Sequence, residues 1–394
     1  MPAPLPLSYC TNVHPGRTVD EVLQGLRQYT QAIRERTGDI AAGLWLAWPV
    51  IHALQDMPQR EHWHDALKQL GLICYTLNTF PFGDFHADRV KDAVYRPDWS
   101  DPRRLEYTLK SAQLLAEMLP PSAEGSLSTL PLAYKPHVTD RPALMARCTD
   151  LLLEAACQLQ ALEQRTGRCI RLGLEPEPLC LLETTDEVLS FFEQLCQAAA
   201  HKGCEEIVRD KVGICFDVCH QAVEFEDPVE SLRRLSRAGL RVVKLHLSSA
   251  LHINHPYDPA NREALAAYVE PRYLHQTSAL TQTGVHWWPD LDMRLLADPP
   301  EPFLQARAWR VHFHVPIHAA QWGPLSTTQR ELQAAFQEVL TWPSPPHLEI
   351  ETYTWPVLTD GEQFDLITGM SQELLTAQRW LADFSNSATE SNTT

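Results

Sequence analysis

Hydrophobic and polar positions follow two different periods along this chain, and the two alternate from one segment to the next. Short runs of apolar and β-branched residues are separated by longer stretches in which apolar residues recur every three or four positions. The first such stretch contains Val22, Leu26, Tyr29 and Ile33, a spacing that places them on one face of a helix. The alternation predicts strands followed by amphipathic helices, which is typical of a parallel sheet with helices packed around it.

Three of the predicted helices begin with the same signal, a threonine followed three residues later by a glutamate. The pairs are Thr18 with Glu21, Thr184 with Glu187, and Thr328 with Glu331. In a capping box the hydroxyl and the carboxylate bind backbone amides that the first helical turn leaves without partners. The signal therefore predicts where each of these helices begins.

Nine short apolar runs are candidates for strands. They cover residues 8–12, 43–48, 72–78, 126–132, 170–175, 212–217, 242–247, 311–315 and 348–352. Eight parallel strands, each followed by a helix, close into an α/β TIM (β/α)8 barrel, so one candidate is in excess. An open doubly wound sheet is the alternative, but the chain has no GxGxxG turn or phosphate-binding loop to support it. We therefore predict a TIM barrel.

No linker divides the chain, so we expect residues 1–384 to form a single barrel domain. Residues 250–308 interrupt the alternation and are rich in Pro, His and Trp. An insertion of about 60 residues is too long for a plain strand–helix connection, and we expect it to form a loop or lid over the barrel mouth that holds the active site. The polar tail, residues 385–394, is expected to be disordered.

The insertion contains polar and aromatic groups suited to closing over a small polar ligand. They are Arg272, His275, Trp287 and Trp288. For the two tryptophans, anchoring of the insertion is the favoured interpretation, because large aromatic side chains most often serve packing.

Acidic and imidazole side chains stand at the ends of several predicted strands. Glu175 and Asp217 directly follow apolar runs, and His246 ends another. Because the carboxyl ends of parallel barrel strands meet at one face, these side chains are expected to converge. Taken singly, an acid after a strand is more often a helix cap, and a histidine in an apolar segment is more often a core residue. Convergence from several strands instead favours a metal site.

Other strand ends add to this set. Two imidazoles alternate in HFH and two carboxylates in LEIE, so each pair lies on one face of its strand. The candidate metal ligands are Glu175, Asp217, His220, His246, His86, His312, His314 and Glu351, with Glu177 and Glu349 as second choices. Carboxylates and imidazoles suit Zn, Mn, Fe or Co, whereas a structural zinc site would use thiolates. Either His312 or His314 could instead support a ligand by hydrogen bonding.

Composition limits the classes of partner. Hydrophobic residues make up 44% of the chain and charged residues 21%, which predicts a globular protein. The net charge of −17 disfavours a nucleic-acid partner, because phosphate backbones are repelled. The chain has no apolar run long enough for a membrane span and no signal-peptide pattern at its start. Its ten cysteines are scattered without CxxC pairs, which predicts reduced thiols in a cytoplasm.

Four motifs resemble a known superfamily. LGLEPEP, GICFDVCH, VVKLHLSS and LEIETYTW are similar to motifs of the xylose isomerase-like TIM barrels, which include sugar-phosphate isomerases, ketose epimerases and endonuclease IV. The resemblance to the epimerases implies metal ligands at Glu175, Asp217, His246 and Glu351. It also implies that the two glutamates exchange protons on opposite faces of the substrate and that His220 binds a substrate oxygen or a second metal.

A longer pattern, which adds SYCTNVHPG, TLNTFPFGDFH and HFHVPIH, resembles the EboE-type metabolite traffic proteins of bacterial secondary-metabolism clusters. That resemblance implies a cytoplasmic barrel that acts on a small metabolite, with other proteins of its gene cluster as partners. The chain departs from the endonuclease branch, which has an additional histidine on its third strand and an Asp-x-His pair where this chain has His312-x-His314. Besides a one-metal site, a site with two or three metals therefore remains a possible interpretation.

Together, the motifs predict a divalent-metal-dependent isomerase or epimerase for a small sugar-like or polyol metabolite. A Lewis-acid cation would assist the transfer of a proton next to a carbonyl group. Two alternatives stay open: a phosphoesterase of the endonuclease IV type, and a non-catalytic protein that binds a metabolite for a partner. The several histidines favour the phosphoesterase, and the negative charge weighs against a DNA substrate.

Overall fold

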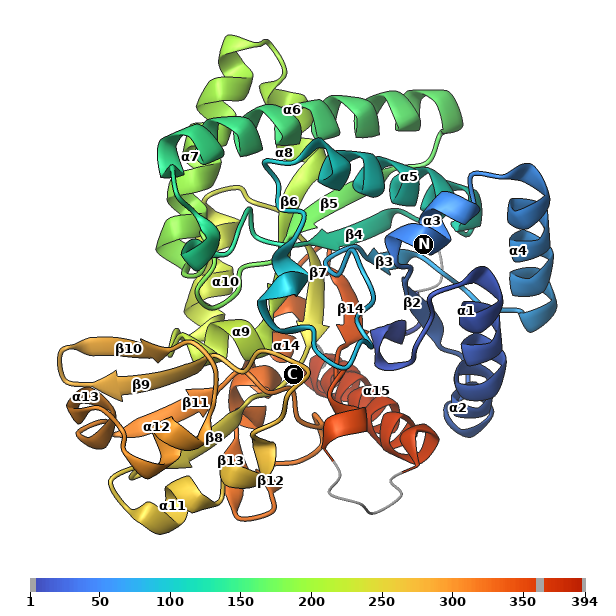
Figure 1. The fold of residues 1–394 in the computed structure, drawn as a ribbon. Helices are drawn as coiled ribbons and strands as arrows, with labels where there is room; N and C mark the ends of the chain where they lie inside the picture. The colour runs from blue at the N-terminus through green and yellow to red at the C-terminus, as the bar shows by residue number, and fades with distance from the viewer. Residues whose placement is uncertain (1–4, 359–364, 392–394) are drawn as a thin grey trace.

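The computed structural model describes residues 5–358 and 365–391. Eight parallel strands close into a barrel in the order β1-β14-β7-β6-β5-β4-β3-β2, with helices packed around it (Figure 1). The barrel strands are β1 (Ser8–Cys10), β2 (Ala41–Trp45), β3 (Thr76–Asn78), β4 (Gly125–Thr129), β5 (Ile170–Leu174), β6 (Val212–Asp217), β7 (Val242–Leu247) and β14 (His347–Ile350). This architecture confirms the predicted α/β TIM barrel.

The ninth predicted strand does not belong to the barrel. The run at 311–315 overlaps only the end of β11 (Ala308–Val311), which pairs antiparallel with β8 (Leu251–Asn254) and β9 (Thr277–Thr281) in a second sheet. It is thus the candidate in excess of the eight barrel strands. The sequence could not identify it, because an apolar run shows that a strand is buried, not to which sheet it belongs. The other eight runs each overlap one barrel strand.

Helices between the barrel strands form the outer layer. They are α1 (Val19–Gly25), the π-helical turn η2 (Leu26–Thr30), α2 (Gln31–Thr37), α3 (Trp48–Ala53), α4 (Met57–Leu70), α5 (Pro102–Met118), α6 (Arg141–Thr166), α7 (Thr185–His201), α8 (Glu205–Lys211), α9 (Val218–Val223), α10 (Pro228–Arg237), α14 (Gln329–Leu340) and α15 (Leu366–Ser391). Short 3-10 turns are η1 (Thr11–Val13), η3 (Lys91–Tyr95), η4 (Lys135–His137) and η6 (Trp355–Val357). One continuous apolar core joins this layer to the barrel. Within the described ranges, no helix has the length and apolar character needed to cross a lipid bilayer.

The capping signals are correct at two of the three helices. Thr184 and Glu187 form the reciprocal capping box at the start of α7, and the Thr18 hydroxyl caps α1. At α14, by contrast, the Thr328 side chain makes no capping hydrogen bond. Its hydroxyl instead accepts a hydrogen bond from the amide of Ala250 at 2.8 Å. A tertiary contact with the start of the insertion thus occupies the group that the local sequence assigns to the helix.

The insertion is a small antiparallel subdomain and not a plain loop. Its six strands follow the order β10-β9-β11-β8-β13-β12, and it has an apolar core of its own. Besides β8, β9 and β11, it contains β10 (Gly284–Trp288), β12 (Gln321–Trp322), β13 (Leu325–Thr327), α11 (Pro259–Glu263), the 3-10 turn η5 (Ala266–Tyr268), α12 (Met293–Ala297) and α13 (Glu301–Leu304). The insertion therefore ends near residue 327, beyond the boundary at 308 that the sequence suggests.

The subdomain lies beside the carboxyl-terminal end of the barrel (Figure 1), directly after β7. Trp288 packs against the subdomain core, and Trp287 packs against a small cluster that includes Cys219 and Val223. Both tryptophans therefore act as anchors, which is the interpretation that the sequence favours.

Helix α15 closes the described part of the chain. Leu374 and Ala377 are fully buried on the face of α15 that packs on the core. The predicted disorder from residue 385 is incorrect as far as Ser391, because α15 continues to that residue, and 392–394 lie outside the described residues. Once a packed helix has formed, each further residue adds one hydrogen bond, so a polar segment can extend it.

Candidate metal centre and ligand pocket

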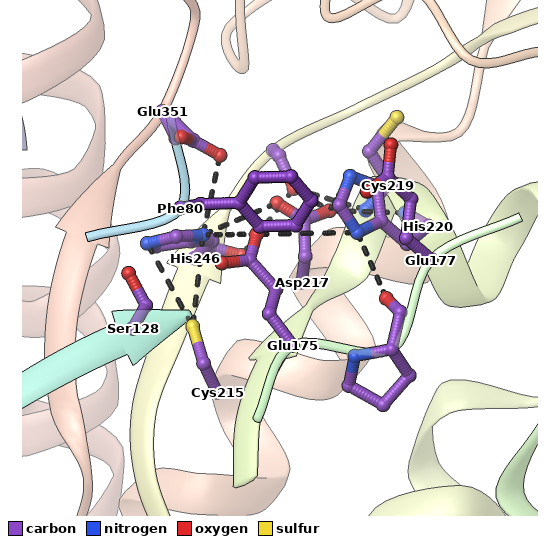
Figure 2. Close-up of polar contacts among 12 residues, drawn as sticks. Phe80, Ser128, Glu175, Glu177, Cys215, Asp217, Cys219, His220, His246 and Glu351 are labelled. Atoms are coloured by element: carbon purple, nitrogen blue, oxygen red, sulfur yellow. Dashed lines mark hydrogen bonds and ion pairs between the residues drawn. The ribbon is translucent and has the colours of Figure 1, made fainter. Parts of the chain in front are cut away.

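Four barrel strands bring one candidate ligand each to a common point. Glu175 follows β5, Asp217 ends β6, His246 lies on β7 and Glu351 follows β14. One ligand atom from each residue lies within 4.8 Å of the others, and all four side chains are buried. Figure 2 shows the three carboxylates around the His246 ring. The convergence follows from the fold, because each apolar strand ends at the same mouth of the barrel.

The imidazole of His246 is crowded by carboxylates. Its Nδ1 lies 3.1 Å from Glu175 Oε1, 3.2 Å from Glu351 Oε2 and 3.4 Å from Asp217 Oδ2. One nitrogen carries at most one proton, so it cannot donate to all three acids. Glu175 Oε2 and Asp217 Oδ2 are buried without a hydrogen-bond partner. Three buried acids and one imidazole, with oxygens left over, fit the requirements of a divalent cation.

The charged groups at this point shift one another's pKa values. Burial raises the pKa of Glu175 to about 7, although His246 opposes the shift. Burial also works against ionisation of Asp217, but the imidazoles around it, His220 foremost, hold its pKa well below the usual range. Burial alone would lower the pKa of His246, yet Cys215 and the neighbouring carboxylates raise it well above its ordinary value. A protonated His246 thus supplies one positive charge beside three acidic groups, and a cation bound at Nδ1 would displace its proton.

A fourth carboxylate, that of Glu349, binds the other ring nitrogen of His246, Nε2. Glu349 Oε2 accepts hydrogen bonds from His246 Nε2 at 3.0 Å and from Lys244 Nζ at 2.7 Å, and all three side chains are fully buried. Burial opposes its ionisation, but Lys244 lowers the pKa of Glu349 to about 2. A Cβ atom at Gly43 would lie 1.4 Å from Glu349 Oε1, so only glycine leaves room for this carboxylate. With Nε2 bound to Glu349, Nδ1 of His246 faces the other acids as a ligand would.

Three more imidazoles lie next to this group (Figure 2 shows His220). The ring centroid of His220 lies 4.5 Å from that of His312 and 5.6 Å from that of His314. Each Nδ1 is within hydrogen-bonding distance of a carbonyl oxygen: Pro176 at 2.9 Å for His220, the Gln276 side chain at 2.7 Å for His312, and the Glu351 backbone at 2.5 Å for His314. This arrangement places the proton on Nδ1 and leaves Nε2 with its lone pair.

The Nε2 atoms of this second cluster are available to a ligand. Those of His312 and His314 are buried without a hydrogen-bond partner. Burial lowers the pKa of His220 and that of His312, so both rings favour the neutral form. Asp217, His220 and His314 bring ligand atoms within 4.8 Å of one another, and so do Glu177, His220 and His312. The residues could therefore hold a second cation.

The origin of His312 and His314 differs from the prediction. They do not lie on a barrel strand, because the strand β11 ends at Val311 and the two residues follow it. The insertion, not the barrel register, places them. Their rings nevertheless lie near each other, with centroids 5.3 Å apart, as the alternating HFH pattern suggests.

His86 lies apart from both clusters. Its Nε2 is 2.8 Å from the backbone oxygen of Asn12, and its ring packs near Trp45. None of the contacts found among the described residues joins it to the acids around His246. Asn12 and Asn78 touch the site instead, since each donates a hydrogen bond to Glu351 Oε1, at 3.0 and 2.9 Å. Asn12 lies in η1, two residues after the end of β1, and it is the last residue of the predicted run 8–12, so the strand-end signal could have identified it.

A cavity of about 60 Å³ lies over the acids at the barrel mouth. The insertion contributes Tyr273, Leu274 and His312 to its lining. His275, a predicted ligand contact, is held on both sides instead: Nε2 lies 2.7 Å from Glu270 Oε1 and Nδ1 lies 2.9 Å from the His312 backbone oxygen. It therefore supports the loop, and its neighbours Tyr273 and Leu274 face the ligand space. Nothing in the sequence around Tyr273 and Leu274 indicates that they line the cavity.

No protein-family model matches the chain, and no curated protein does either. Solved structures that resemble it include sugar epimerases. A 3-keto-D-glucoside 4-epimerase from E. coli is 14% identical, with 62% of this chain and 78% of the other covered and a TM-score of 0.38. A D-psicose 3-epimerase from Clostridium cellulolyticum H10, solved with D-tagatose, is 13% identical over 61% and 72% of the two chains, with a TM-score of 0.39. A D-psicose 3-epimerase structure determined in the presence of D-fructose is 12% identical over 86% of each chain, with a TM-score of 0.43. At these scores the likeness says nothing about the ligand of this chain, whose barrel is established by its own strand order.

Proposed function

We propose that this protein is a divalent-metal-dependent isomerase or epimerase for a small hydroxylated ketone or polyol. The observation that carries the proposal is the convergence of Glu175, Asp217, His246 and Glu351 at the base of a cavity, with buried oxygens that lack partners. These four residues would hold the cation. When bound, a divalent cation polarises a carbonyl group and so acidifies the neighbouring C–H bond.

The chain itself supplies the groups that move the proton. Glu175 and Glu351 directly follow β5 and β14, which are separated in the barrel by β6 and β7, so their carboxylates approach a ligand from different sides. One carboxylate takes a proton from the carbon next to the carbonyl, and the C–H electron pair moves into the enediolate. The other returns a proton to the opposite face, which inverts the carbon without net oxidation. His220, through Nε2, is placed to bind a ligand oxygen.

A phosphoesterase is the second candidate, and the imidazole cluster is the observation that favours it. Two adjacent cations commonly activate water and stabilise the leaving oxygen in phosphate hydrolysis. His220, His312 and His314, with their Nδ1 atoms bound to carbonyl oxygens, could hold the second cation. The net charge of −17 weighs against a nucleic-acid substrate.

The motif resemblance gives the proposal a biological setting. We infer that the chain is an EboE-type metabolite traffic protein with a small metabolite as its ligand. All ten cysteines are free in the structure, which supports a cytoplasmic location. We also treat the barrel and its insertion as one domain, because side chains of both line the same cavity.

Solvent exchange tests the function directly. Protein loaded with Mn²⁺ is incubated in D₂O with a panel of ketoses, among them D-fructose and D-ribulose, and deuterium at the carbon next to the carbonyl is followed by NMR. We expect metal-dependent exchange that is lost in Glu175→Gln and Glu351→Gln. Glu230→Gln, at an exposed position on α10, is the control and should exchange like wild type. Tight metal and ketose binding without exchange would favour a carrier, and hydrolysis of bis(4-nitrophenyl) phosphate would favour the phosphoesterase.

A further inference from the structure

The ligand cavity has two chemically different parts. The acids and imidazoles line one part. Phe85, Val90, Val94, Tyr273 and Tyr353 line the other. The two parts make different demands on a ligand.

The polar part contains atoms that need a partner. Glu177 Oε2, His312 Nε2 and Asn12 Oδ1 are buried and make no hydrogen bond, and all three residues line the cavity. Leaving a buried polar group unsatisfied costs free energy, so a ligand that donates hydrogen bonds here gains affinity. Hydroxyl groups are such donors. This part of the cavity therefore fits a hydroxylated end of a ligand.

The apolar part is a continuous aromatic wall. The ring centroids of Phe85, Tyr273 and Tyr353 lie 4.9 Å (Phe85–Tyr273), 5.3 Å (Phe85–Tyr353) and 4.9 Å (Tyr273–Tyr353) apart. Val90 belongs to the same buried cluster, and Val94 packs against it. The wall combines the loop after β3 with the insertion and the segment after β14. The Tyr273 hydroxyl is buried here without a hydrogen-bond partner. Apart from that group, the surface offers a polyhydroxylated chain few hydrogen bonds, but it can bury an apolar group.

The charges around the cavity disfavour a phosphate group. Of the described residues that line it, Lys91 is the only one with an ammonium or guanidinium group. Its Nζ lies 2.7 Å from Asp290 Oδ2 and 2.9 Å from the Glu270 backbone oxygen, so it is already neutralised outside the cavity. Glu351 would repel an anionic ligand, because His246 lowers the pKa of this carboxyl group although burial opposes its ionisation. The cavity therefore selects against phosphorylated sugars.

We propose that the ligand is an uncharged hydroxy-ketone or polyol that carries an apolar, ring-sized substituent. Its hydroxylated end reaches the acids and imidazoles, and its substituent packs against Phe85, Tyr273 and Tyr353. This assignment rests on the proposed function, because it takes the acid end as the place where adjacent oxygens bind. It adds that the insertion selects the ligand, since Tyr273 belongs to it.

A matched pair of ketones tests this assignment. Hydroxyacetone and 2-hydroxyacetophenone share the hydroxy-ketone group and differ by methyl against phenyl. Calorimetric titration of Mn²⁺-loaded protein should give a Kd for the phenyl ketone at least about tenfold lower, because burial of a few extra carbon atoms in an apolar pocket discriminates on this scale. Dihydroxyacetone phosphate should bind no more tightly than hydroxyacetone. Equal Kd values for the two ketones, or tighter binding of the phosphate, would overturn the assignment.

Variants locate the effect. Tyr273→Ser and Phe85→Ala should bring the ratio of the Kd for hydroxyacetone to the Kd for 2-hydroxyacetophenone close to one. Tyr257→Ser, at an exposed position of the same insertion, should keep the wild-type ratio. If a wall variant does not fold by circular dichroism, the wild-type ratio of the two Kd values still decides. Deuterium exchange into hydroxyacetone is measured in parallel. A phenyl preference without exchange contradicts the proposed function alone, and exchange without a phenyl preference contradicts the assignment alone.

Discussion

The two clusters of candidate ligands reach the same mouth by different routes. The acids around His246 all stand on or directly after barrel strands, so the register of the sheet places them. His312 and His314 follow β11 of the insertion, and the Gln276 side chain and the Glu351 backbone hold their rings. The first cluster therefore depends on the barrel alone. The second also depends on how the insertion docks, and the two should respond differently to mutation.

Removal of the ammonium group beneath the first cluster should have the largest effect. Lys244→Met keeps the side-chain volume but leaves Glu349 buried without its cation, which typically costs about 3–5 kcal/mol of folding free energy. The double variant Lys244→Met/Glu349→Gln removes both charges and should recover much of that loss. Urea denaturation of the single and double variants measures the coupling. Additive losses would show that the pair is not coupled.

Glu373 of α15 contacts both the segment that follows β11 and the segment that follows β14, and its contribution to folding stability should depend on pH. Its carboxylate accepts hydrogen bonds from the Ile317 amide, the Thr352 hydroxyl and the Trp355 indole, but burial raises its pKa to about 7. The folded protein thus binds this proton more tightly than the unfolded chain. The contribution is fully present below about pH 4.5 and is lost as the pH rises through 7, a change of roughly 3 kcal/mol.

Glu373→Gln should remove this slope. The difference in unfolding free energy between variant and wild type should change in favour of the variant as the pH rises from 4.5 to 7. Chemical denaturation at several pH values measures it. A difference that does not vary with pH would mean that Glu373 ionises normally in the folded protein.

Loss of one acid should weaken metal binding more than it weakens the barrel. Asp217→Asn keeps the acceptor that binds the His220 amide and the Ser248 hydroxyl, so the cap of α9 and the packing survive. The variant loses one anionic ligand, and we expect metal affinity to fall by about 100-fold or more. The melting temperature without metal should fall modestly, because the imidazoles around Asp217, His220 foremost, favour its ionised form in the folded protein. A metal-induced shift equal to that of wild type would leave Asp217 as a helix cap only.

The smallest effect is expected for Gln276→Leu, which should change metal binding at the imidazole cluster but not at the acids around His246. Gln276 donates to the Tyr95 hydroxyl at 2.7 Å and accepts from His312, so it links the insertion to the wall of the cavity. Gln276→Leu should lower the affinity for a second equivalent of Zn²⁺ or Co²⁺ by about tenfold, because the Gln276 side chain orients the His312 ring as a ligand. The first equivalent should bind as in wild type. Equal losses for both equivalents, measured by chelator competition, would contradict the independence of the clusters.

The local period and the strand register account for the features that could be predicted. Alternating strands and amphipathic helices implied the barrel, and the polar residues at the strand ends marked Glu175, Asp217 and His246, together with the pair Glu349 and Glu351. Parallel strands in a closed barrel end at one mouth, so residues that are far apart in the chain converge without further information.

The remaining features depend on contacts between segments that lie far apart in the chain. Whether Glu349 or Glu351 faces Nδ1 of His246, and the burial of Lys244 beneath them, depend on side-chain packing inside the barrel. The assignment of the 311–315 run to the insertion, and of Tyr273 to the cavity wall, depends on contacts between distant segments. Local propensity carries no record of such contacts, because the same apolar pattern is satisfied by any surface that buries it.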